Sequence, residues 1–164
     1  MRLKKTFSVI IILFVGLFCS NAYADSFIIK INLTEGEHSK DNWSSETSIS
    51  IDGSMFLYAK SYSGSAKGHS KDIAKNCTLT DDQVTQIQTL LKDKNLLKSD
   101  SLFDKDEKYK SFERFVNISM KISVWETLSK ISVNGDANSL KDAELYKNCY
   151  ALINLLNDIA DQCN

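Results

Sequence analysis

The side chains best suited to acid–base or metal chemistry are scarce in this sequence. Its two histidines, His38 and His69, lie 31 positions apart in polar stretches. A zinc site needs three or four His, Cys or carboxylate ligands at a recognisable spacing, and neither histidine has such neighbours. We therefore predict no metal site and no cofactor, and we expect both histidines to be exposed to solvent.

Two segments resemble ligand-binding motifs only superficially. The stretch from Gly64 to Ser70 has the glycines of a phosphate loop, but the second glycine comes one position early and His69 replaces the lysine. Residues 104 to 107 are mostly acidic, yet they lack the turn glycine and the distant glutamate of a calcium loop. The spacing of the acidic residues selects no catalytic pair, so no catalytic residue is assigned.

Residues 1 to 24 are typical of a cleavable secretory leader of a bacterial protein. Three basic residues among the first five precede an apolar run over residues 7 to 18, and Ala22-Tyr23-Ala24 supplies the small residues that signal peptidase accepts. The run is much shorter than the roughly 20 residues of a membrane-spanning helix. Phe18, directly before Cys19, is too large for a lipidation site. We predict cleavage before Asp25, export to the periplasm or beyond, and no remaining membrane anchor.

The chain after the leader is expected to form one domain over residues 25–164. Its 140 residues suit a single core. The leader takes three of the 20 basic residues and none of the 21 acidic ones, which leaves a net charge of −4. Such a balance predicts no nucleic-acid partner.

Alternating apolar and polar residues predict strands in three places. Residues 27 to 34 alternate and are expected to end at Gly36, with a loop over residues 37 to 45. Ile49 and Ile51 lead into Asp52-Gly53, a hairpin turn signal, and residues 54 to 62 form the return strand. Two registers of this return strand stay open: Met55, Leu57 and Ala59 point inward, or Phe56, Tyr58 and Tyr62 do. Residues 73 to 79 are a further short strand candidate.

The clearest hairpin comes later in the chain. Residues 116 to 124 alternate strictly, and their partner is expected over residues 128 to 133. A turn at Glu126-Thr127 would place Ile122 opposite Ile131 and Met120 opposite Val133. Ile122, at the centre of the alternation, is predicted to be a core residue.

Two helices complete the pattern. Thr80 and Gln83 have the spacing of a capping box, followed by an apolar stripe through Leu91. Ser139 is the expected N-cap of a second helix that runs to about Ala160. The order strand, hairpin, short strand, helix, hairpin, helix predicts an α+β fold: an antiparallel sheet built from hairpins with two helices packed on one face.

Three cysteines follow the leader, an odd number in an oxidising compartment, so one disulfide and one free thiol are expected. Cys149 and Cys163 are 14 positions apart on one predicted helix, about 21 Å, which is far beyond the reach of a disulfide. Cys77 is therefore the common member. We favour Cys77 with Cys163, because Cys149 lies midway along the apolar stripe; Cys77 with Cys149 is the alternative.

Aromatic side chains are the one feature that favours binding. Phe115 and Trp125 fall on the polar side of the clearest strand, and Tyr58 and Tyr62 join them in one of the two registers. Exposed aromatics anchor protein interfaces. We favour a non-catalytic module that binds another protein of the envelope or extracellular space, such as an inhibitor, immunity factor or adaptor. The alternative is a small secreted hydrolase that uses His38 or His69 with a carboxylate or cysteine.

Overall fold

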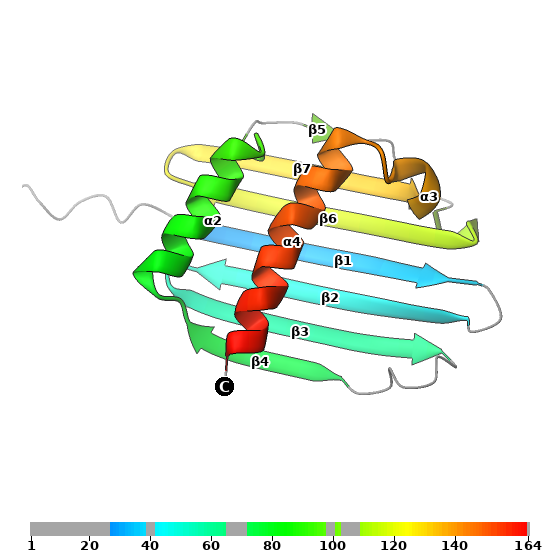
Figure 1. Cartoon of the computed structure of the whole chain (residues 1–164), viewed down its shortest axis with the longest axis horizontal. Coiled ribbons are helices and arrows are strands. Elements are labelled where there is room, and N and C mark those ends of the chain that lie inside the picture. Colours follow the sequence, from blue (N-terminus) through cyan, green and yellow to red (C-terminus); the bar gives the residue numbers. More distant parts are fainter. Residues whose placement is uncertain (1–26, 39–41, 65–71, 98–100, 103–108, 164) are drawn as a thin grey trace, which may run out of the picture.

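The computed structural model describes residues 27–38, 42–64, 72–97, 101–102 and 109–163. The predicted leader and cleavage site, and His69, lie outside these residues. The described residues build a single sheet with strand order β4-β3-β2-β1-β6-β7-β5, which is covered by helices on one face (Figure 1). The predicted α+β class is confirmed.

Among the described residues, six strands of six to eleven residues pair antiparallel, and a two-residue strand joins one edge in parallel. The antiparallel strands are β1 (Phe27–Glu37), β2 (Trp43–Asp52), β3 (Met55–Gly64), β4 (Ile73–Thr78), β6 (Arg114–Val124) and β7 (Thr127–Asp136), and β5 (Ser101–Leu102) pairs with β7. The first strand of the sequence is thus the central strand of the sheet. The short strand expected near residue 73 is present as β4.

The two long helices, α2 (Asp81–Asp93) and α4 (Glu144–Gln162), lie across the same face of the sheet (Figure 1). They run antiparallel, since Gln83 near the start of α2 donates to Gln162 at 3.3 Å and Asn148 near the start of α4 donates to the Lys94 carbonyl at 3.2 Å. A short helix α3 (Ala137–Leu140) and a 3-10 turn η1 (Tyr109–Ser111) complete the described elements.

The core lies between the sheet and these helices. Alternate residues of β1 and β6 enter it, and Ile29 and Ile122 are fully buried there, so the prediction for Ile122 is confirmed. In β3, Phe56 and Tyr58 face the helices while Leu57 stays exposed. This resolves the open register, because Phe56 lies opposite the buried Ile51 of β2.

Capping explains where the helices begin. Thr80 accepts from the Gln83 amide at 3.2 Å, and the Gln83 side chain accepts from the Thr80 amide at 2.9 Å, so the predicted capping box is confirmed. The prediction for Ser139 was wrong. Asp136 caps α3 instead, and Ser139 is a donor to its carboxylate at 2.7 Å, while α4 begins only at Glu144.

The first strand does not end at Gly36, and the second begins at Trp43 rather than after residue 45. Gly36 lies inside β1 because the Phe115 ring of β6 packs over it. A Cβ atom at Gly36 would lie 2.5 Å from Cζ of Phe115 and 2.6 Å from the Trp43 carbonyl oxygen. This glycine therefore permits a close approach within the sheet instead of breaking it.

The pairing of β6 with β7 differs from the prediction by two residues. The turn is Trp125-Glu126, so Ile122 faces Ser129 and Met120 faces Ile131. Trp125 adopts a φ of 54°, the left-handed region that a tryptophan rarely occupies. A shift by two keeps every side chain on its predicted face.

Cys77 of β4 and Cys163 form a disulfide with a Cα–Cα distance of 5.7 Å. This is the pair that the sequence favoured. The Lys75 ammonium also donates to the Cys163 carbonyl at 2.9 Å, so two bonds attach the end of α4 to the edge strand. Cys149 of α4 is a free thiol and is fully buried.

Candidate functional site

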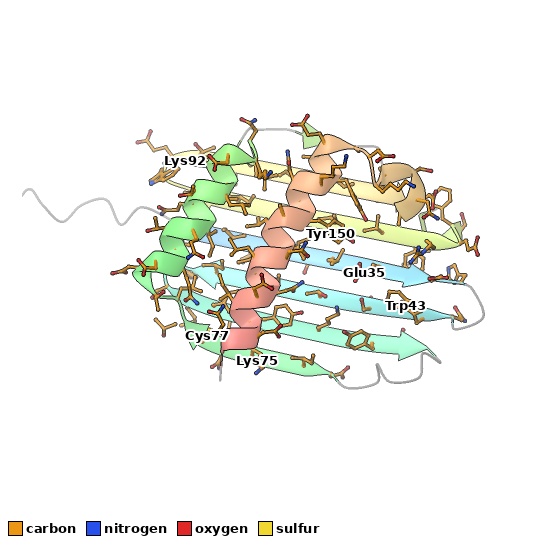
Figure 2. The ribbon with its side chains drawn as sticks, viewed as in Figure 1. Glu35, Trp43, Lys75, Cys77, Lys92 and Tyr150 are labelled. Carbon is orange, nitrogen blue, oxygen red and sulfur yellow. A yellow bond between two sulfur atoms is a disulfide. The ribbon has the colours of Figure 1, made fainter. Side chains whose placement is uncertain are left out.

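At one end of β1 the helix-covered face carries polar and aromatic side chains instead of aliphatic ones. The strand register sets their arrangement. Glu35 lies opposite Ser45 of β2, and one row further out Glu37 lies between Trp43 of β2 and Arg114 of β6. Figure 2 shows Glu35 and Trp43 on the part of this face beside α4.

Two hydroxyl groups hold the carboxylate of Glu35. The Tyr150 hydroxyl, which reaches it from α4, donates to Oε2 at 3.0 Å, and the Ser45 hydroxyl donates to Oε1 at 3.4 Å (Figure 2). Burial, and then the negative charge of Glu35, raises the pKa of the Tyr150 hydroxyl, so Tyr150 keeps its proton and remains a donor. The Tyr146 ring packs against Tyr150 with centroids 4.6 Å apart.

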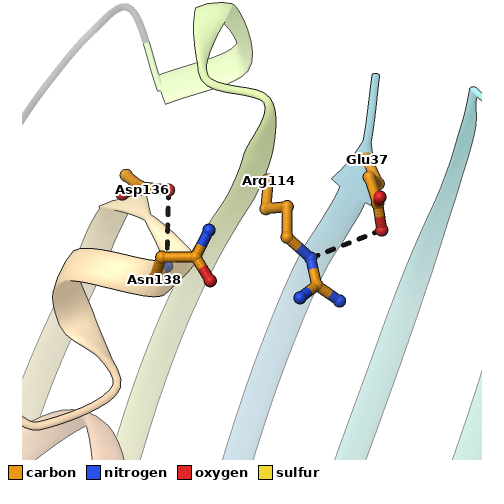
Figure 3. Close-up of polar contacts among 4 residues, drawn as sticks. All are labelled: Glu37, Arg114, Asp136 and Asn138. Carbon is orange, nitrogen blue, oxygen red and sulfur yellow. Dashed lines mark hydrogen bonds and ion pairs between the residues drawn. The ribbon is translucent and has the colours of Figure 1, made fainter. Parts of the chain in front are cut away.

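An ion pair borders this carboxylate on the outer side. Nε of Arg114 lies 3.3 Å from Oε2 of Glu37 (Figure 3). Figure 3 also shows Asn138 at the start of α3, whose amide donates to Asp136 at 3.3 Å. The hydrogen bond from Ser139 lowers the pKa of the Asp136 carboxyl, which keeps the cap ionised.

These groups line a cleft of about 360 Å³ between the ends of β1 and β6 and the start of α4. Its lining includes the aromatic residues Trp43, Phe115, Tyr146 and Tyr150 and the polar residues Glu35, Arg114, Asn138 and Lys141. Aromatic rings offer a large contact area at small entropic cost, and a fixed carboxylate selects ligands that donate hydrogen bonds. The cleft is therefore suited to hold a side chain that has an apolar stem and donates hydrogen bonds.

Tyr62, one of the aromatics singled out from the sequence, extends the same surface. It lies opposite Ser45 and hence in the cross-strand row of Glu35. The Lys60 ammonium lies 5.1 Å from the centre of its ring. Tyr58 lies four residues, or two pleat repeats, before Tyr62 in β3, and at 8% exposure it is a core residue.

Phe115 borders the cleft as a buried residue, and Trp125 lies away from it. Phe115 was expected to be exposed, and this was wrong: it is 4% exposed, between Gly36 and the ring of His38, whose centroid lies 5.1 Å away. Trp125 sits at the opposite end of β6, about 30 Å along the strand, with the Lys92 ammonium 4.3 Å from its ring centre. The four aromatics singled out from the sequence therefore form no single patch.

The His38 side chain is held by hydrogen bonds to its two ring nitrogens and by a ring contact. Its Nε2 lies 2.7 Å from the Lys110 carbonyl oxygen, and Nδ1 lies 3.2 Å from Oδ1 of Asn42. Neither partner is a carboxylate or a thiol. These bonds and its ring contact with Phe115 attach the end of β1 to the segment before β6.

Sequence reasoning missed Glu35, Tyr146 and Tyr150. One signal was available: Glu35 continues the buried series Ile31 and Leu33 at the next alternate position, so a carboxylate stands on an apolar face. Its partner Tyr150 is 115 positions away, and no local pattern relates the two.

Over the described ranges, no group of three or more His, Cys, Asp or Glu side chains is arranged to hold a metal ion. In that same part of the chain, no helix is long and apolar enough to cross a membrane. Comparisons with protein-family models, curated proteins and solved structures found no significant match to this chain.

Proposed function

We propose that the protein is an exported, non-catalytic module that binds another protein of the envelope or extracellular space, as an inhibitor, immunity factor or adaptor. The observation that carries the proposal is the cleft beside α4, which Trp43, Tyr146 and Tyr150 line together with Glu35, whose carboxylate accepts from Tyr150. Tryptophan, tyrosine and arginine are the residue types most enriched at the energetic centres of protein interfaces.

The geometry of the cleft favours binding because its polar groups are already oriented. Glu35 accepts two hydroxyl hydrogen bonds, and Arg114 is paired with Glu37, so these side chains lose little rotamer freedom when a partner arrives. A carboxylate can accept further donors at its remaining lone pairs. A partner lysine or arginine side chain would place its stem between the aromatic rings and its charge at Glu35.

Export is supported by the leader pattern of residues 1 to 24 and is compatible with the disulfide between Cys77 and Cys163. Intact-mass spectrometry of protein recovered from the periplasm and medium tests it. We expect a mature chain that begins at Asp25. An uncleaved chain in the membrane fraction, or a lipid on Cys19, would contradict this part of the proposal.

The binding proposal is tested by site-specific photo-crosslinking in cells. A photoreactive residue replaces Lys141, which lines the cleft, and in a matched control it replaces Gln86, which is exposed on α2. We expect one discrete protein adduct from the first position and none from the second. Equal adducts from both positions, or none from either, would reject the cleft as a binding site.

Affinity for the captured protein then tests the role of the carboxylate. Glu35→Gln removes the charge and should weaken binding by about tenfold or more, the usual loss for a hydrogen bond to a charged group. Glu46→Gln is the matched control, since Glu46 lies on the neighbouring strand but on the opposite face. Equal affinities of the two variants would exclude recognition through Glu35.

A further inference from the structure

The face of the sheet away from the helices carries three lysines in one row across the strands. Lys121 of β6 lies opposite Lys30 of β1 on one side and opposite Lys130 of β7 on the other. All three side chains are exposed. Because neighbouring strands lie about 4.8 Å apart, three positive charges originate within about 10 Å of sheet. We call Lys30, Lys121 and Lys130 the lysine row.

No ion pair within 4 Å neutralises the lysine row among the described residues. Asp52 of β2 lies opposite Ile28, in the row next to Lys30. In the described part of the chain it forms no ion pair with Lys30 within 4 Å. Like charges placed directly opposite one another destabilise a sheet. Repulsion within the lysine row therefore opposes folding, and a negatively charged ligand would reduce this repulsion.

Apolar side chains and a hollow lie beside the row. Met55 and Leu57 of β3 are 60% and 44% exposed. Leu57 continues the lysine row, because it lies opposite Ser50 of β2, which lies opposite Lys30. Next to them the small side chains of Ser48, Ala59 and Ala74 leave a hollow of about 680 Å³ over β2, β3 and β4. Cationic and apolar groups are thus adjacent on one surface.

We propose that this face docks an acidic segment of a partner protein, whose carboxylates contact the lysine row and whose apolar side chains enter the hollow beside Leu57. A polyphosphate or nucleic-acid strand would use the lysines but would leave Met55 and Leu57 without a counterpart, so the apolar neighbours favour a protein segment. The inference goes beyond the proposed function: it concerns the face opposite to the cleft, and it stands or falls independently of the cleft.

Fluorescence anisotropy with a labelled peptide of alternating glutamate and leucine tests the proposal on the full mature chain. We expect saturable binding that weakens as salt is added, because screening acts on exposed charges. A peptide of alternating glutamine and leucine should bind at least about tenfold more weakly. Leu57→Ser should also weaken binding of the glutamate peptide while leaving the salt dependence unchanged.

The decisive variant is the triple substitution Lys30→Gln, Lys121→Gln and Lys130→Gln, which should reduce affinity for the glutamate peptide by about tenfold or more. The matched control neutralises three exposed lysines of the helical side in the same way: Lys92, Lys94 and Lys147. If the triple variant fails to fold, Lys121→Glu alone replaces it, since one reversed charge should give the same direction of change.

Three results would overturn the proposal. Absence of peptide binding at low salt is the first, and equal losses in the lysine-row and control variants is the second. The third is binding of inorganic polyphosphate, or of vesicles of anionic lipid, that exceeds peptide binding and is insensitive to Leu57→Ser. That outcome would assign the row to a different class of polyanion. None of these results bears on Glu35 or the cleft.

Discussion

Removal of the disulfide between Cys77 and Cys163 should cost the fold a large part of its stability. The two cysteines are separated by 86 positions. In the chain-entropy treatment, closure of a loop of this length in the unfolded state is worth about 4.6 kcal/mol at 25 °C. Measured losses for natural disulfides are about 2 to 5 kcal/mol. We expect the double variant Cys77→Ala and Cys163→Ala to lose free energy of unfolding within that range.

Urea unfolding followed by tryptophan fluorescence measures the loss. Trp43 and Trp125 lie at opposite ends of the sheet, so coincident transitions of both would support a single cooperative unit. The dependence on urea should steepen in the double variant, because its unfolded chain is less restricted and exposes more surface.

A reductant provides the internal control. It should lower the midpoint of the wild-type protein to that of the double variant, and it should leave the double variant unchanged, since Cys149 has no disulfide to lose. A loss below about 1 kcal/mol on reduction, in the range of surface substitutions, would show that the bond adds little to the native contacts. A shift of the double variant by reductant would refute the assigned pairing.

Three further predictions concern the core. Ile122→Ala should cost about 2 to 5 kcal/mol in urea unfolding, because Ile122 is fully buried, whereas Leu128→Ala, at a site 47% exposed, should change stability by no more than about 0.5 kcal/mol. Burial raises the pKa of Cys149 from 9.0 to about 12, so above pH 9 the unfolded chain releases a proton that the folded chain retains. Stability should then fall by up to about 1.4 kcal/mol per pH unit, and this component should be missing from Cys149→Ala when unfolding is measured across that range. Gly36→Ala should cost about 1 to 3 kcal/mol by overpacking against Phe115, and a thermal midpoint equal to wild type would contradict the close approach.

Elements specified by neighbouring residues could be predicted from the sequence. The alternation through Ile122 identified β6 and its buried face, and the spacing of Thr80 and Gln83 identified the start of α2. Both depend on contacts within a few positions of the chain, where side-chain type and backbone geometry are directly coupled.

Features that depend on one unusual backbone conformation or on distant partners were not predicted. The register of β6 and β7 required a tryptophan with a φ of 54°, against the preference of bulky residues. The end of β1 was predicted wrongly because Gly36 makes room for the Phe115 ring, and Phe115 lies 79 positions further along the chain.

The polar groups on the two faces of the sheet depend most strongly on residues that are distant in the sequence. Glu35 meets Tyr150 only when α4 crosses the sheet, and Lys30 meets Lys121 and Lys130 only when three strands pair. The net charge of −4, which argued against a nucleic-acid partner, is a sum over residues 25–164 and conceals a local cluster of one sign.

The central strand β1 also sets how the protein tolerates changes in length. Lys30 and Glu35 are five positions apart, an odd number, and therefore project from opposite faces about 17 Å apart along the strand. Insertion of a single residue between them would turn both side chains to one face. It would also turn the buried apolar residues of β1 on one side of the insertion out of the core. Insertion of two residues would preserve the faces but would displace Glu35 from Tyr150 by a full pleat repeat. Length variation in related chains should therefore be confined to the connections between strands.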